Sequence, residues 1–217
     1  MPESIVIVGA ARTPMGSFQG DFSSLAAHDL GGVAIRAAME RAGIAPELVT
    51  ELLMGNCLMA GQGQAPARQA GFKGGLPKSA GAVTLSKMCG SGMKAAMFAH
   101  DMLLAGSHEV MVAGGMESMT NAPHLLMGSR TGIRYGSTEM LDHMAWDGLT
   151  NPYDKQPMGN FGELCADKYS FTRAEQDAFA AESVRRALAA QADGSFKAEI
   201  AAVTVSGRKG DVIVDSD

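Results

Sequence analysis

Short apolar runs alternate with helical segments over the first half of this sequence, and this alternation constrains the fold more than any other feature. Four runs predict strands, of which the first and the last are expected to be buried: Ser4–Val8, Glu51–Asn56, Ala82–Leu85 and Glu109–Ala113. Three segments between them have the spacing or the start and stop residues of helices: Asp29–Arg41, Pro66–Gly74 and Gly90–Ala105. Successive strands joined through helices lie parallel in one sheet. We therefore predict an α/β fold, with a mainly parallel sheet and helices on its faces.

The composition suits close-packed layers and argues against two kinds of partner. Glycine accounts for 27 of the 217 residues, and only 19% of the residues are charged. The net charge is −5, and no segment gathers enough Lys and Arg to neutralise many phosphates, so we expect no nucleic-acid partner. No apolar run approaches the ~18 residues of a membrane span, so we expect no membrane partner either.

The cysteines and the N-terminal residues bear on the compartment. Cys57, Cys89 and Cys165 are widely spaced and form no CxxC pair, which is typical of a reducing environment. The short apolar run near the N-terminus has no basic region before it, so we expect no targeting segment and a cytoplasmic location.

The pattern changes after Met116, and we divide the chain into residues 1–117 and 118–217. Residues 118–157 show no strand pattern and only one short predicted helix, Glu139–Trp146. Such long excursions from a sheet are usually functional or form a separate subdomain. A capping box at Thr172 and Glu175 predicts a long helix to about Ala192. Two further strands are predicted at the end: Val203–Ser206 and Val212–Val214.

Cys89 is the residue best placed for chemistry. It lies between a predicted strand and a predicted helix, at the carboxyl end of a parallel strand, where open α/β sheets place their sites. The N–H groups and the dipole of the helix start favour a thiolate there and could also bind an oxyanion. Gly90 and Gly92 leave room beside the sulfur for a thioester with a long carrier arm.

Other interpretations of the same segment stay open. An isolated cysteine is more often a small buried apolar residue than a nucleophile, and no local base is present, since His100 lies eleven residues further along. The segment GSGMKA also matches a variant dinucleotide-binding fingerprint, although the turn before it is long and Glu109 begins the next strand instead of ending it. A serine-hydrolase elbow fails, because Cys89 stands where Ser91 would need a glycine.

The histidines predict no metal site. None of the five, His28, His100, His108, His124 and His143, pairs with another His or a Cys at zinc-like spacing. We therefore expect no metal ion at these residues.

Several motifs together resemble the thiolase family, and within it the acetyl-CoA acetyltransferases. The resemblance runs from end to end. It is carried by ARTPMGSF (11–18), PARQA (66–70), MCGSGMKA (88–95), VAGGMESMTNAPH (112–124), DGLT (147–150), MGNFGE (158–163) and GRKGD (207–211). The combination of CGSG with AGGMESM at this distance is specific. The related ketoacyl synthases share the position of the nucleophile without this context.

The resemblance implies a reversible ping-pong Claisen condensation of acetyl-CoA to acetoacetyl-CoA and coenzyme A, with Cys89 carrying the acyl group. It also implies a thiolase-like layered fold, with residues 1–117 as the N-terminal domain and 118–217 as part of an inserted loop domain covering coenzyme A. The family's apolar coenzyme A contacts correspond to Leu149 and Met158. Many biosynthetic members have His directly before that methionine, whereas this chain has Pro157.

The resemblance further implies what the 217 residues do not contain. The family's activating His and its second Cys belong to a C-terminal half, so we expect the 217-residue chain alone to be inactive. A noncatalytic binding or assembly module built from a thiolase-like half is the competing hypothesis. Homodimers or homotetramers are expected from the family, with the segment around Gln64–Gln69 near subunit contacts.

Overall fold

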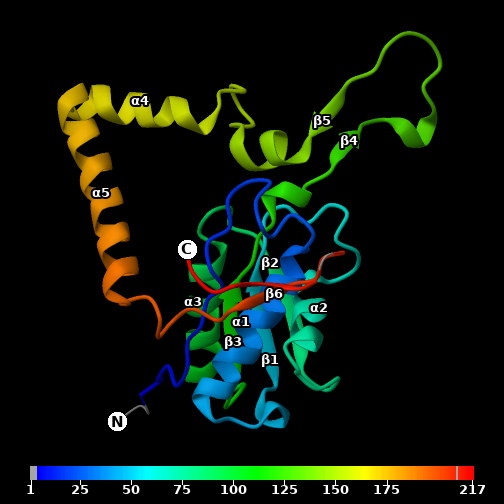
Figure 1. The fold of residues 1–217 in the computed structure, drawn as a ribbon. Coiled ribbons are helices and arrows are strands. Elements are labelled where there is room, and N and C mark those ends of the chain that lie inside the picture. The colour runs from blue at the N-terminus through cyan, green and yellow to red at the C-terminus, as the bar shows by residue number, and fades with distance from the viewer. Residues whose placement is uncertain (1–3, 209) are drawn as a thin grey trace. The chain divides into compact units, whose positions relative to one another are not determined.

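The computed structural model describes residues 4–208 and 210–217, which form two compact units (Figure 1). The described part of unit 1 lies within Met1–Pro123 and Glu199–Asp217, and unit 2 is His124–Ala198. The predicted boundary after residue 117 lies within unit 1, and residues 199–217 cluster with unit 1. None of the described helices combines the length and the apolar character needed to cross a bilayer.

Unit 1 is built on alternating helices and strands. Their bounds are α1 Ala27–Ala42, β1 Glu51–Gly55, α2 Pro66–Lys73, β2 Gly81–Leu85, α3 Ser91–Leu104 and β3 Met111–Gly115. Among the described residues, the three strands form one parallel sheet in the order β2-β1-β3. The α/β fold, the parallel sheet and the three predicted helices are thereby confirmed, and α2 and α3 are the helices that join successive parallel strands.

The two faces of the sheet pack on different helices. Leu52 and Met54 of β1 belong to a core cluster with residues of α1 and α2, whereas Leu53 packs with Ala95 and Ala99 of α3. Neighbouring residues of a strand point to opposite faces, so this division follows from the pleat. The central strand β1 is therefore buried on both sides.

The predicted strand Ser4–Val8 is wrong. Within the described chain these residues belong to no strand, and Val6, Ile7 and Val8 are exposed, Ile7 to 89%. A strand needs a neighbouring backbone to pair with, and an apolar run reports only the preference of its side chains. Pairing begins a few residues later, where the Arg12 N–H donates to the Glu199 carbonyl at 2.9 Å and the Ala201 N–H to the Arg12 carbonyl at 2.7 Å.

The C-terminal segment returns to unit 1 and ends in the antiparallel pair β6 (Val203–Val205) and β7 (Val212–Val214), which confirms the two predicted strands. Arg12 holds this segment through a two-pronged ion pair, with its Nη1 and Nη2 donating to the Asp217 carboxylate at 2.7 and 2.8 Å. The Arg12 Nε donates to Glu199 at 2.8 Å. The hydrogen bonds that Arg12 donates to the Asp217 carboxylate hold the pKa of Asp217 below its usual range.

Unit 2 differs from its prediction. It begins with the antiparallel hairpin β4 (His124–Leu126) and β5 (Met140–Asp142), in a stretch where no strand is predicted. The predicted helix Glu139–Trp146 is wrong in its first half, because β5 occupies it, and a π-helical turn runs over Met144–Leu149. Strands of three residues are too short to show a period, and the hairpin forms through pairing across a long loop. Short 3₁₀ turns lie in unit 1 at Pro46–Leu48 and Met119–Asn121, and in unit 2 at Ser129–Thr131.

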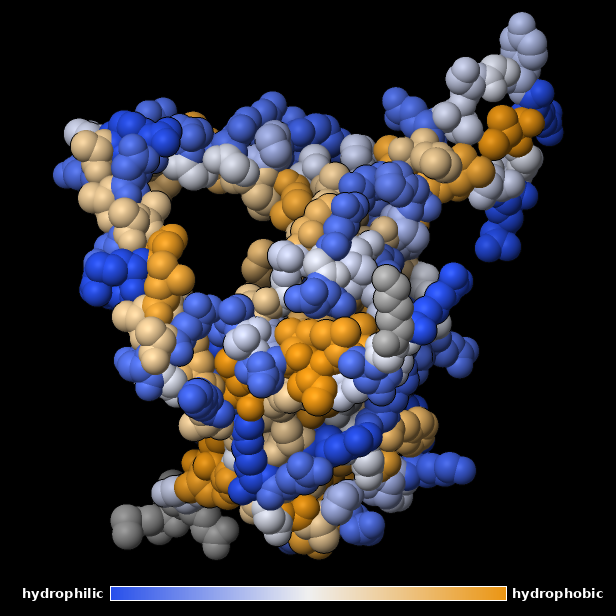
Figure 2. All heavy atoms as spheres, viewed as in Figure 1, coloured by the Kyte–Doolittle hydropathy of each residue, from blue (hydrophilic) through white to orange (hydrophobic). Residues whose placement is uncertain are grey.

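Two helices complete unit 2. They are α4, Met158–Tyr169, for which no helix is predicted, and α5, Arg173–Asp193. The capping box that predicts α5 is confirmed, because the Glu175 N–H donates to Thr172 Oγ1 and the Thr172 N–H donates to Glu175 Oε2. Figure 2 shows apolar side chains along this helix among charged ones, and Phe179, Val184 and Leu188 are exposed.

The ion pair of Arg12 predicts a pH-dependent contribution to stability. Since the pKa of Asp217 is depressed in the folded state, its carboxylate stabilises the fold above the unfolded-state pKa, and this contribution is lost as pH falls through the folded-state pKa. We expect Asp217→Asn to lower the free energy of unfolding by roughly 1 kcal/mol at pH 7 and by much less at about pH 2. Urea unfolding at both pH values checks this.

Asp211→Asn, at another exposed aspartate of the same segment, is the control and should leave the free energy of unfolding unchanged. A loss in Asp217→Asn that is equally large at both pH values would contradict the assignment to this ion pair.

Candidate functional site

The parallel sheet brings three chain segments to one edge. In register, Gly55 at the end of β1 lies between Leu85 at the end of β2 and Gly115 at the end of β3. The residues that follow these strands therefore meet at the carboxyl edge of the sheet. This is the edge at which open α/β sheets form their sites.

Cys89 lies at this edge, in the tight turn between β2 and α3. The residue before it, Met88, has a φ of 48°, in the left-handed region that residues other than glycine rarely adopt. Gly90 follows as the N-cap of α3, and Cys89 itself is exposed. The structure thus places Cys89 at an accessible helix start, in the position predicted from the sequence.

Ser91 closes the turn by hydrogen bonds in both directions. Its Oγ accepts from the Lys87 N–H at 2.8 Å and donates to the Met88 carbonyl at 2.6 Å. The Ser91 N–H donates to the same carbonyl at 3.1 Å. Ser91 is only 4% exposed, so the hydroxyl is shielded from water. These bonds hold the backbone on both sides of Cys89.

Glycines let the start of α3 approach the sheet closely. A Cβ on Gly55 would lie 2.5 Å from the Ser91 carbonyl carbon and 2.6 Å from the Gly92 nitrogen. A Cβ on Gly115 would lie 3.2 Å from the Gly92 Cα. Backbone therefore packs on backbone where α3 begins, and the strand ends determine where the turn with Cys89 lies.

A polar network lies beside this turn. Asn56, only 1% exposed, donates from its Nδ2 to Glu117 Oε1 at 2.6 Å, and its Oδ1 accepts from Gln62 Nε2 at 2.9 Å. Glu117 Oε2 accepts from the Cys57 N–H at 2.8 Å. These contacts tie the end of β1 to the end of β3. Asn56 and Glu117 are not among the residues predicted from the sequence, although polar residues within two positions of the end of a parallel strand are a usable signal.

Cys57 contacts the turn of Cys89 from the end of β1. Its thiol donates to the Met88 carbonyl at 3.0 Å and lies 3.6 Å from Ser91 Oγ. Burial raises the pKa of the Cys57 thiol, and the nearby charge of Glu117 acts in the same direction. Cys57 therefore stays protonated at neutral pH. Cys165, the third free cysteine, lies exposed on α4 of unit 2.

Leu149 and Met158 lie in unit 2, whereas Cys89 lies in unit 1. Leu149 ends the π-helical turn and Met158 begins α4, and both side chains are exposed. The adjoining residues Thr150 and Pro157 form an antiparallel bridge. The fold of unit 2 thereby brings the two predicted contact segments next to each other.

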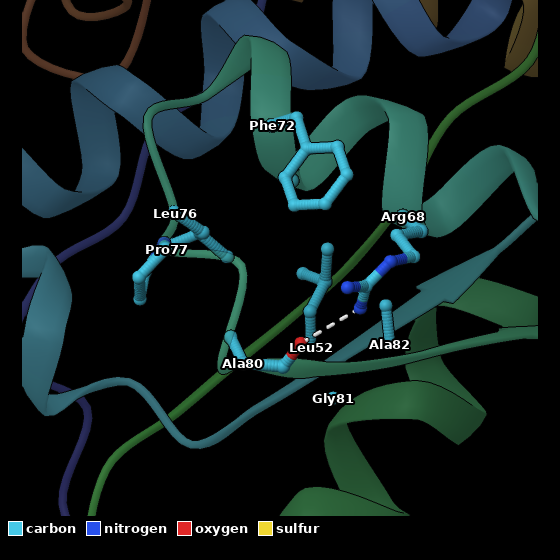
Figure 3. Close-up of a pocket in the computed structure, with 9 residues that line it drawn as sticks. Leu52, Arg68, Phe72, Leu76, Pro77, Ala80, Gly81 and Ala82 are labelled. Carbon is cyan, nitrogen blue, oxygen red and sulfur yellow. Dashed lines mark hydrogen bonds between the residues drawn. The ribbon is translucent and has the colours of Figure 1, made fainter.

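Within the described ranges, no group of three or more His, Cys, Asp or Glu residues is arranged to hold a metal ion. Figure 3 shows a small, mainly apolar pocket between α2 and β2. Its one charged lining residue, Arg68, donates to the Lys78 and Ala80 carbonyls at 3.0 Å and lies over the Phe72 ring. Arg68 therefore stabilises the loop between α2 and β2, and Cys89 is not among the lining residues.

The fold and the turn at Cys89 define an α/β protein with an exposed cysteine at a helix start. Comparison with known proteins shows which family this α/β protein belongs to. Residues 5–217 match the family model described as Thiolase, N-terminal domain. The chain belongs to the thiolase family, as its motifs indicate.

Three proteins similar to this chain are all named acetyl-CoA acetyltransferases. Acetyl-CoA acetyltransferase 2 of Arabidopsis thaliana is 49% identical over 100% of this chain and 54% of that protein. An acetyl-CoA acetyltransferase of Cupriavidus necator is also 49% identical, over 96% of this chain and 53% of that protein. A solved structure of an acetyl-CoA acetyltransferase from Syntrophomonas wolfei has a TM-score of 0.91, at 38% identity over 98% of this chain and 53% of that one. The thiolase-like fold is thereby confirmed, and the chain spans about half the length of these relatives.

The contact between Gly55 and the start of α3 predicts a position that cannot accept a side chain. We expect Gly55→Ala to lower the free energy of unfolding by about 1–3 kcal/mol, because the new methyl group would overlap backbone atoms. Gly162→Ala, in the interior of α4 with no neighbouring atom near its virtual Cβ, is the matched control and should be neutral or slightly stabilising. Urea unfolding compares the two, and an equal effect in both variants would contradict the close contact.

Proposed function

We propose that this chain is part of an acetyl-CoA acetyltransferase, which converts two acetyl-CoA into acetoacetyl-CoA and coenzyme A in a reversible reaction. The observation that carries the proposal is the accessible Cys89 at the start of α3, in a member of the thiolase family whose relatives bear this name. The substrates are thioesters, so the proposal needs no metal and no separate cofactor.

In the proposed first half-reaction, Cys89 is the nucleophile. The thiolate attacks the carbonyl carbon of acetyl-CoA, the new carbon–sulfur bond forms, and the bond to coenzyme A breaks. Coenzyme A leaves as a thiolate that takes up a proton, and Cys89 carries the acetyl group. By resemblance to the family, the Cys89 N–H stabilises the oxyanion of the tetrahedral intermediate.

In the second half-reaction, a carbanion formed from a second acetyl-CoA attacks the acetyl-cysteine. The carbon–carbon bond forms, the bond to Cys89 breaks, and acetoacetyl-CoA leaves while the thiolate returns. By the resemblance, the proton transfers belong to a His and a second Cys in the part of the family sequence that these residues do not span. We accordingly expect residues 1–217 by themselves to be inactive, and the proposal concerns the full-length protein.

In this proposal, unit 2 contacts the coenzyme A part of the substrate. We propose that Leu149 and Met158 make apolar contacts with coenzyme A, and their adjoining residues are paired across the Thr150–Pro157 bridge.

A homodimer or homotetramer and a cytoplasmic location are further expectations of the same proposal. On location the relatives differ, since one from Xenopus laevis is named as mitochondrial.

The assignment of Cys89 predicts loss of turnover in Cys89→Ala. In the full-length protein, we expect the rate of acetoacetyl-CoA cleavage by coenzyme A to fall by at least about 1,000-fold, because no covalent intermediate can form. Intact mass after incubation with acetyl-CoA should show one acetyl group in the wild-type protein and none in the variant. Cys165→Ala is the control for an exposed cysteine. Near-normal turnover in Cys89→Ala would refute the nucleophile and favour a noncatalytic module.

The assignment of Met158 predicts an effect on binding. We expect Met158→Ala to raise the KM for acetyl-CoA roughly 3- to 10-fold with kcat little changed, because an apolar contact made equally in ground and transition states is removed. Leu164→Ala, on the same helix but roughly 120° around its axis, should leave KM unchanged. Equal effects of both substitutions would argue against a specific contact at Met158.

A further inference from the structure

The Met88 carbonyl receives three donors, and two of them are side chains. The Cys57 thiol donates to it at 3.0 Å, the Ser91 hydroxyl at 2.6 Å and the Ser91 N–H at 3.1 Å. Cys57 comes from the end of β1 and Ser91 from the first turn of α3, so the carbonyl is held from two separate elements. Three donors to the backbone carbonyl directly before a candidate nucleophile point to a functional role for the orientation of this carbonyl.

The peptide plane explains this role. The Met88 carbonyl and the Cys89 N–H belong to the same planar peptide unit and point in opposite directions. Whatever holds the carbonyl towards β1 and α3 therefore turns the Cys89 N–H away from them. That N–H is the donor that the proposed reaction uses for the oxyanion, so its direction matters for catalysis.

We propose that Cys57 and Ser91 are positioning residues, which hold the Met88 carbonyl and thereby aim the Cys89 N–H at the oxyanion of the acyl-transfer reaction. The inference rests on the proposed function of Cys89. It adds two residues, neither of which touches the substrate, and it explains why Met88 keeps a left-handed φ of 48° that few residues other than glycine adopt.

Both residues are equipped for this role. Ser91 cannot drift, because it is buried and a Cβ on Gly55 would lie only 2.6 Å from the Ser91 Cβ. Its Oγ also accepts from the Lys87 N–H, so its hydroxyl proton is directed at the Met88 carbonyl. Cys57 remains a donor at neutral pH, since burial raises the pKa of its thiol. The same protonation makes Cys57 a poor nucleophile.

The test separates aiming of the N–H from loosening of the turn. Acetylation of Cys89 by acetyl-CoA passes through an oxyanion, whereas alkylation of Cys89 by iodoacetamide is a direct displacement at carbon and forms none. Both rates are measured in the full-length protein, by mass spectrometry of the peptide that contains Cys89. Cys57→Val removes the donor at nearly constant volume, Cys57→Ser keeps a donor, and Ser91→Ala removes the other hydroxyl.

We expect acetylation and kcat to fall about 10-fold in Cys57→Val and about 10- to 100-fold in Ser91→Ala, with the KM for acetyl-CoA changed less than about twofold. Alkylation of Cys89 should stay within about twofold of the wild-type rate. Cys57→Ser should restore at least about a third of the wild-type acetylation rate. Cys165→Val, in unit 2, controls for loss of a cysteine, and the melting temperature of each variant reports whether it folds.

Three results would overturn the inference. One is wild-type acetylation in Cys57→Val, the variant whose folding is least at risk. Another is a parallel fall in acetylation and alkylation, which would indicate a loosened turn. The third is a Cys57→Ser variant as slow as Cys57→Val. If the wild-type protein itself forms no acetyl-cysteine while alkylation of Cys89 proceeds, the proposed function fails, and this inference falls with it.

Discussion

The backbone contact between the first turn of α3 and the ends of β1 and β3 is the constraint on which the candidate site depends. Gly55 and Gly115 carry no side chain, so the strands meet Ser91 and Gly92 directly. Main chain packed on main chain leaves little freedom to slide, because any shift of the helix start must move the sheet as well. The parallel sheet, buried under helices on both faces, therefore determines where the turn before α3 lies.

That turn owes its geometry to its neighbours. Met88 has an unfavourable backbone conformation, and its carbonyl accepts hydrogen bonds from Ser91 and Cys57, while the Lys87 N–H donates to Ser91 Oγ. Cys89 is exposed and makes no comparable contribution to packing. Cys89 is thus left accessible while the residues around it are fixed. This combination suits the proposed role of Cys89 as a nucleophile, which would have to admit a long thioester substrate and meet its carbonyl carbon in one orientation.

Local signals predicted those parts of the fold that depend on local physics. The capping box of α5 is made by residues three apart, so the sequence contains both halves of the interaction. The apolar run at Glu51–Asn56 predicts a strand, and β1 occupies Glu51–Gly55. Ser4–Val8 is also an apolar run but has no strand partner among the described residues, and the β4–β5 hairpin forms from strands too short to show a period. Strand formation depends on a partner backbone that a local pattern cannot supply.

The sequence by itself determined that this is an α/β protein of the thiolase family with Cys89 between a strand and a helix, because periodicity and motif spacing are carried by neighbouring residues. Only the tertiary structure decided what surrounds that cysteine. Glu117 reaches Asn56 across 61 positions of the chain, and Cys57 reaches Met88 across 31. Such contacts arise because parallel strands, however far apart in sequence, end at the same edge of the sheet. Which residues meet at this edge therefore depends on the register of the strands, and no local sequence pattern contains that information.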